Sequence, residues 1–276
     1  MNHAISTHYF INHRLTTAAL DKLQGIGITT VEIFCARQHL DYHNHAQIDE
    51  LAHWFRDSEL KLHSLHSPMY NDDANGRSGP QAIVNIADRV KAKRIAACDE
   101  IKRALEIAEQ VPFRYLVQHL GAPRDDYDDA KFDAGFASLD ELRLFAKHRG
   151  VEILLENIPN GLSSAEKLLL FQQQTHLDVG FCFDTGHAHI MGGVEQEFEL
   201  MKDRIRSLHV HDNDGVKDSH LFPTLAAGGS IAWDKVMPML RARQHQYPLL
   251  LELKESPDFP QPLDTFPKIF KNLESF

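Results

Sequence analysis

The chain has 276 residues, of which 43% are hydrophobic and 25% are charged, values typical of a globular protein with a sizeable core. The formal net charge of -10 argues against a broad nucleic-acid-binding surface, and three scattered cysteines argue against a disulfide framework. No signal-peptide pattern is present, and no apolar stretch approaches the roughly 18 residues of a membrane span. We therefore expect a cytoplasmic protein without a membrane partner.

Strand-like and helix-like segments alternate along the whole chain. Eight short apolar runs predict strands buried on both faces, at residues 4–6, 31–34, 61–64, 115–118, 152–155, 179–183, 207–210 and 249–251. Helical patterns lie between them, at residues 16–25, 48–58, 133–149, 164–174, 234–243 and 264–272. The long interval 79–110 predicts one long helix, with room for a short one before it.

This alternation runs without a linker, a low-complexity tract or a change in composition. It predicts one domain over residues 1–276, a single (β/α)₈ TIM barrel of parallel strands. An open, doubly wound α/β sheet is the alternative. Such a sheet binds ligands at one switch point between strands, whereas a barrel gathers all its strand ends into a ring.

Histidine and acidic side chains recur where the apolar runs end. These residues are His66, His119, Glu156, Asp184, His209 and Glu252. A carboxylate at the end of a buried strand is costly unless it is paired or bound to a cation. For Glu252 a salt bridge to Lys254 is the alternative to a metal. Since the strand ends of a barrel converge, the pattern favours one shared metal site.

The segment Asp184-Thr185-Gly186-His187 is the sharpest local motif. Asp184 closes a strand, and His187 can face the same axis as the chain turns into its next segment. We expect Gly186 to allow a tight backbone turn between them. The alternative is an aspartate that caps a helix, with a histidine nearby by chance.

Two further histidine motifs follow. His209 and His211 alternate along a strand and share one face, so either is a candidate ligand. Asp218 and His220 lie two residues apart in a polar loop, which is a weak signal by itself. Nitrogen and carboxylate donors without cysteine suit Zn²⁺ first, with Mn²⁺ possible. The candidate contacts to substrate are Tyr70, His211 and Trp233.

The motifs resemble those of the xylose isomerase-like TIM barrels, also called AP endonuclease family 2. The matching segments are HSPMYN, VQHLG, LLENIPNG, FDTGHAH, SLHVHD, DSH and LLLELK. The resemblance to the trinuclear zinc site of endonuclease IV implies nine metal ligands, too many for one ion and suited to two or three. They are His66, His119, Glu156, Asp184, His187, His209, Asp218, His220 and Glu252.

Two branches of this family imply different reactions. Resemblance to the ketose 3-epimerases implies one metal on Glu156, Asp184, His209 and Glu252, with Glu156 and Glu252 as catalytic acid and base at carbon. Resemblance to endonuclease IV implies a phosphoesterase with three zinc ions and abasic DNA as its partner. A lyase or dehydratase on the same barrel is a third possibility.

The sequence departs from both branches. Leu162 and Gly215 stand where the epimerases have an acid and an arginine, and the first strand reads HAISTHYF where endonuclease IV has Gly-Ala-His-Val-Ser. We expect first a metal-dependent isomerase or epimerase of a small-molecule sugar or sugar derivative, and second a phosphoesterase. The oligomeric state is not set by any pattern in the chain.

Overall fold

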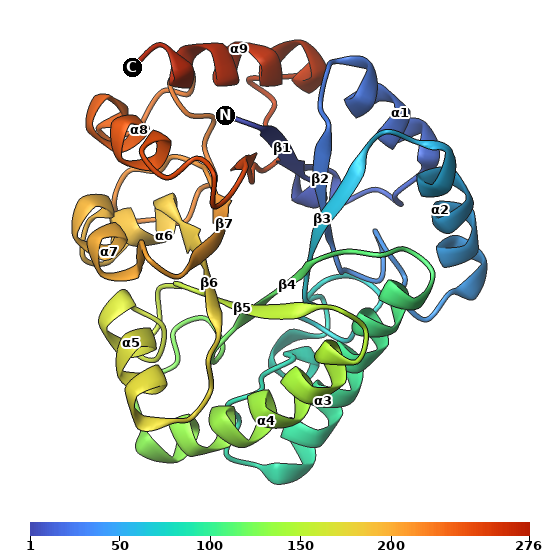
Figure 1. Cartoon of the computed structure of the whole chain (residues 1–276), viewed down its shortest axis with the longest axis vertical. Coiled ribbons are helices and arrows are strands. Elements are labelled where there is room, and N and C mark those ends of the chain that lie inside the picture. The colour runs from blue at the N-terminus through green and yellow to red at the C-terminus, as the bar shows by residue number, and fades with distance from the viewer.

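Eight parallel strands form the centre of the molecule in a computed structural model, which describes residues 1–276 (Figure 1). They are β1 (His3–Ser6), β2 (Thr30–Phe34), β3 (Lys61–His66), β4 (Tyr115–His119), β5 (Glu152–Glu156), β6 (Gly180–Asp184), β7 (Ile205–His209) and β8 (Leu249–Leu251). From β1 to β7 each strand pairs with the next one in sequence, and β8 pairs with β1. A parallel bridge between Val210 and Leu251 joins the β7 chain to β8 and closes the ring. The predicted single (β/α)₈ barrel is confirmed.

The helices surround this barrel as an outer layer (Figure 1). They are α1 (Thr17–Gly25), α2 (His45–Asp57), α3 (Lys91–Glu106), α4 (Asp129–Lys147), α5 (Ala165–Gln174), α6 (Thr185–Ile190), α7 (Val194–Met201), α8 (Trp233–Arg241) and α9 (Pro262–Glu274). Short 3-10 turns lie at Thr7–Phe10, Gly79–Ala82 and Ile107–Glu109. None of the helices combines the length and the apolar character that a membrane crossing needs.

Side-chain caps set where several helices begin. The side chains of Thr16, Asn44, Asp128 and Ser164 accept backbone N–H groups in the first turns of α1, α2, α4 and α5. Because Asn44 caps the helix, α2 begins at His45, earlier than residue 48, where the apolar stripe predicts its start. Helices α6 and α7 are absent from the sequence prediction because each is too short for a clear helical period.

The barrel interior changes character from its floor to its rim. Four interior side chains form a small apolar cluster, made of Tyr115, Val117, Leu154 and Cys182. Because side chains on one face of a strand recur every second residue, the next interior positions on β4, β5 and β6 are His119, Glu156 and Asp184. The apolar floor therefore supports a ring of polar side chains at the carboxyl ends of the strands.

Candidate metal centre

The nine predicted ligands gather at the carboxyl ends of β3 to β8 and in the loops that follow. A cavity of about 290 Å³ opens there, and seven of the nine contribute to its wall. Asp184 and His209 do not line the cavity and are fully buried. The barrel topology thus brings together residues that are as far apart in the sequence as His66 and Glu252.

The ligand-type side chains fall into three groups. Within each group, one nitrogen or oxygen atom of every residue lies within 4.8 Å of the others. The groups are His66, His119 and Glu156; Glu156, Asp184, His209 and Glu252; and His187, His211, Asp218 and His220. Glu156 belongs to two groups, so these two share one carboxylate and are adjacent.

In the first group, two imidazoles face one carboxylate. Glu156 Oε2 lies 3.0 Å from His119 Nε2 and 3.4 Å from His66 Nε2. His66 Nδ1 lies 2.9 Å from the carbonyl oxygen of Ser67, which can only accept a hydrogen bond. Nδ1 of His66 therefore carries a proton, and Nε2 is the nitrogen that can bind a metal. Burial disfavours the charged form of His66, but the hydrogen bond and charge of Glu156 outweigh it and raise the pKa.

The second group centres on His209. Its Nδ1 atom lies 2.9 Å from Glu156 Oε1, 3.1 Å from Glu252 Oε2 and 3.9 Å from Asp184 Oδ2. Burial, together with the charge of Glu156, raises the pKa of Glu252 to about 7, although His209 acts in the opposite direction. Three carboxylates around one imidazole nitrogen, buried from water, form a set that a divalent cation would neutralise.

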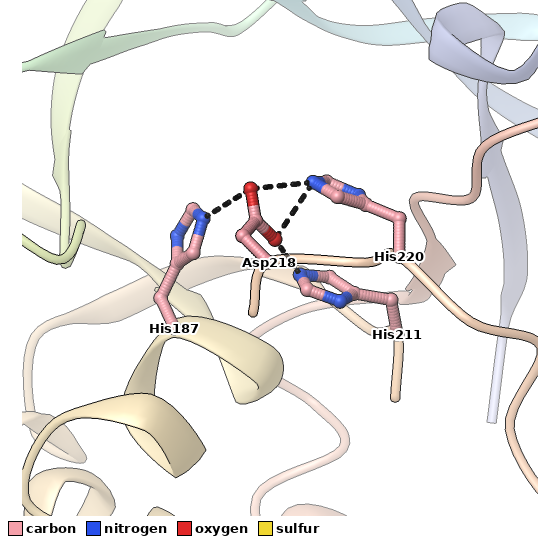
Figure 2. A group of neighbouring side chains, drawn as sticks. All are labelled: His187, His211, Asp218 and His220. Carbon is pink, nitrogen blue, oxygen red and sulfur yellow. Dashed lines mark hydrogen bonds and ion pairs between the residues drawn. The ribbon is translucent and has the colours of Figure 1, made fainter. Parts of the chain in front are cut away.

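The third group is shown in Figure 2, with Asp218 between three imidazoles. Asp218 Oδ1 lies 3.1 Å from His220 Nε2, and Asp218 Oδ2 lies 3.6 Å from His187 Nε2. The Nδ1 atoms of His187 and His220 each lie 3.0 Å from a backbone carbonyl oxygen, that of Asn157 and that of Glu252 respectively. Both Nδ1 atoms must then donate, which leaves each Nε2 directed toward Asp218 as a potential ligand. This donor set fits a divalent metal ion.

The comparison with known proteins agrees with this architecture. The family model described as the xylose isomerase-like TIM barrel matches residues 20–273. The chain belongs to this family. It is 24% identical over 225 residues to the uncharacterized protein y4fM of Sinorhizobium fredii, a match covering 75% of this chain and 71% of that protein.

Solved structures share the barrel of this xylose isomerase-like protein over its full length. A D-tagatose 3-epimerase-like protein superposes with a TM-score of 0.79 at 22% identity, covering 100% of this chain and 97% of the other. The 3-keto-D-glucoside 4-epimerase YcjR of E. coli gives 0.77 at 15% identity, covering 100% of both chains. The IOLI protein with a bound zinc atom superposes with a TM-score of 0.72 at 18% identity, covering 100% of this chain and 98% of the other. At these identities the likeness establishes the fold.

The predicted substrate contacts have different positions in this xylose isomerase-like barrel. Tyr70 lines the cavity. His211 lies outside the cavity wall; it stacks on His220 with ring centroids 3.9 Å apart, and its Nε2 lies 3.0 Å from Asp184 Oδ1. Trp233 also lies outside the cavity wall, where its indole N–H donates to Asp212 Oδ2 at 2.7 Å. Each of these two side chains contacts a neighbouring carboxylate, and their contact with a substrate stays a prediction.

Two other expectations change. Gly186 does not have a positive φ, so a tight turn is not its role. A Cβ atom at Gly186 would lie 2.0 Å from the ring of His211, so the position needs glycine to admit that ring. Lys254 approaches Asp218, with Nζ 3.9 Å from Oδ2, and the predicted alternative of a salt bridge to Glu252 is absent.

Sequence reasoning missed two buried residues near the ligands. Glu32 in β2 is fully buried, and its Oε1 lies 3.0 Å from His209 Nε2. His8, in the 3-10 turn after β1, lines the cavity and leaves its Nδ1 without a partner. The available signal for Glu32 was an acid inside the apolar run VEIF, since a charge within a fully buried strand needs a partner.

Proposed function

We propose that this protein is a divalent-metal-dependent isomerase or epimerase that acts on a sugar or sugar derivative. The observation that carries the proposal is the position of Glu156 and Glu252. They come from β5 and from the end of β8, both line the cavity, and both approach His209 Nδ1 within about 3 Å. Two such groups at one site can serve as base and acid, one removing a proton from one face of a carbon and the other returning a proton to the opposite face.

Glu156, Asp184, His209 and Glu252 would hold the metal nearest to the reacting carbon, with Zn²⁺ as the first choice and Mn²⁺ as the second. A divalent cation bound there acts as a Lewis acid toward sugar oxygens. One glutamate then takes the proton from the carbon beside the carbonyl. The other returns a proton to carbon, so that isomerisation or epimerisation consumes no co-reactant.

The cavity favours a small substrate. Its volume of about 290 Å³ lies at the lower end of ligand pockets and suits a monosaccharide. Phe34 and Tyr70 supply aromatic surface, and Asn75 and Lys254 supply polar groups at the wall. Of the similar structures, one is an epimerase, one is an epimerase-like protein, and a third contains a bound zinc atom, which supports the same class of chemistry.

Deuterium exchange tests the proposal most directly. The protein, loaded with Zn²⁺ or Mn²⁺, is incubated with a panel of ketoses and sugar phosphates in D₂O, and NMR follows deuterium entering carbon positions and new epimers. We expect Glu252→Gln to slow the exchange by about 10²–10⁴-fold. Glu197→Gln is the matched control, because Glu197 is a buried carboxylate of α7 outside the three groups. Absence of exchange across the panel would contradict the proposal.

A phosphoesterase of the endonuclease IV type is the second candidate. The observation that favours it is the presence of three ligand groups, two of them joined through Glu156, where one metal needs a single group. About three ions per chain, with cleavage of an abasic-site duplex that Glu252→Gln abolishes, would replace the first proposal. About one ion per chain, with deuterium exchange at carbon, would support the isomerase or epimerase proposal.

A further inference from the structure

The two ring nitrogens of His209 face different partners. Nδ1 faces Glu156, Asp184 and Glu252, as described above. On the opposite edge of the ring, Nε2 lies 3.0 Å from Oε1 and 3.2 Å from Oε2 of Glu32. His209 and Glu32 are both fully buried and come from strands β7 and β2, on different sides of the barrel.

We propose that Glu32 is a positioning residue of the metal centre, which accepts the Nε2–H of His209 and thereby directs the Nδ1 lone pair toward the metal. The inference rests on the proposed metal site and adds to it a residue that is not a ligand. An ionised carboxylate can only accept, so Nε2 of His209 carries a proton toward Glu32. In the metal-free protein Nδ1 carries a proton as well, because it faces Glu156 and Glu252, and metal binding displaces only the proton on Nδ1. The charge of Glu32 also makes the imidazole a stronger metal donor.

The surrounding strands are built to hold Glu32 in this position. Its other oxygen, Oε2, accepts a hydrogen bond of 2.7 Å from Ser64 Oγ on β3. The register between β2 and β3 shifts between Val31 and Glu32, so that Glu32 pairs with Ser64 and His63 is the extra residue. A β-bulge of this kind re-aims side chains. Ser64 is fully buried, as Glu32 itself is.

A purely structural role for Glu32 makes a different prediction. If the carboxylate only joined β2 to β3 through Ser64, its removal would lower stability and leave metal affinity unchanged. If it orients His209, its removal weakens metal binding by roughly 10–100-fold, the usual effect of losing a carboxylate behind a metal-bound histidine. Metal affinity therefore separates the two roles.

The test compares Glu32→Gln with the parent and with Glu197→Gln. Glu197 is a suitable control because it is also buried and accepts a hydrogen bond, 2.7 Å from the backbone N of Ala165, away from the metal groups. Zn²⁺ affinity is measured by competition with a chromophoric chelator, and the absorption spectrum of bound Co²⁺ reports the ligand geometry. We expect Glu32→Gln to lower Zn²⁺ affinity roughly 10–100-fold and to change the Co²⁺ spectrum, while Glu197→Gln changes neither.

Equal affinity in the parent and in Glu32→Gln would overturn the role of Glu32 and leave the proposed metal site intact. Absence of metal binding in the parent would overturn both. Should Glu32→Gln fail to fold, ¹⁵N NMR of histidine-labelled, Zn²⁺-loaded parent protein decides the matter. A proton on Nε2 of His209 supports the inference, and a proton on its Nδ1 refutes it.

Discussion

Replacement of Gly186 by alanine tests how closely the metal centre is packed. By helix propensity alone, alanine within α6 would stabilise the protein by up to about 1 kcal/mol. The structure predicts the opposite. A Cβ atom at this position would lie 2.0 Å from Cε1, 2.4 Å from Nδ1 and 2.7 Å from Nε2 of His211. Carbon atoms in contact prefer about 3.5 Å or more, so the ring must move by more than about 1 Å.

The ring of His211 cannot move freely, which sets the magnitude. It stacks on His220 at 3.9 Å and lies 3.0 Å from Asp184 Oδ1. Overpacking of this kind costs about 1–3 kcal/mol, and a weakened hydrogen bond to a charged group adds to it. We expect Gly186→Ala to lower the free energy of unfolding by about 2 kcal/mol, which corresponds to a fall in Tm of roughly 4–8 °C.

Chemical and thermal unfolding of the metal-free protein measure this change, and metal content per chain shows whether the third group still binds. The control is Gly25→Ala at the end of α1, where no atom lies within 4 Å of the added Cβ and no loss of stability is expected. A Gly186→Ala protein as stable as the parent, with the same metal content, would refute the packing argument.

Three further predictions concern the charges and contacts of the site. In the metal-free protein the folded state raises the pKa of Glu252 from 4.5 to about 7 and raises the pKa of His209 above 6.5. A group with a raised folded-state pKa contributes stability that is fully present at low pH and is lost as the pH rises through that pKa. The contribution of these two groups to the free energy of unfolding should therefore fall between about pH 5 and 8. Zn²⁺ affinity should rise over the same range, because the metal must displace their protons. A Zn²⁺ affinity that does not change with pH would contradict this prediction. Asp184→Asn keeps the shape of the side chain and its cap on His187 N–H but removes the charge, so metal content should fall while circular dichroism is unchanged; retention of every ion would exclude Asp184 as a ligand. Trp233→Phe removes the indole donor to Asp212 and should cost about 1.5–3 kcal/mol in unfolding experiments without changing metal content; a loss of metal instead would place Trp233 in the site.

The sequence by itself predicted the barrel and the chemical nature of its site. Both depend on local pattern: a buried strand needs an apolar run, and a polar side chain at the end of such a run points to the rim that all strands share. Thus Glu156, Asp184 and Glu252 were identifiable from where their runs stop. Helices α6 and α7 were not, because short helices lack a full hydrophobic period.

Only the tertiary structure decided which side chains meet. Glu32 contacts His209 across 177 positions of sequence, and a β-bulge in the neighbouring strand sets the register that pairs it with Ser64. His211 and Trp233 are residue types common in pockets. In the folded protein, His211 contacts Asp184 at the end of β6, and Trp233 contacts Asp212 in the loop after β7. Hydrophobic pattern sets where a strand is and which face is buried. Barrel closure and register set the partner at each interior position, and these depend on all eight strands together.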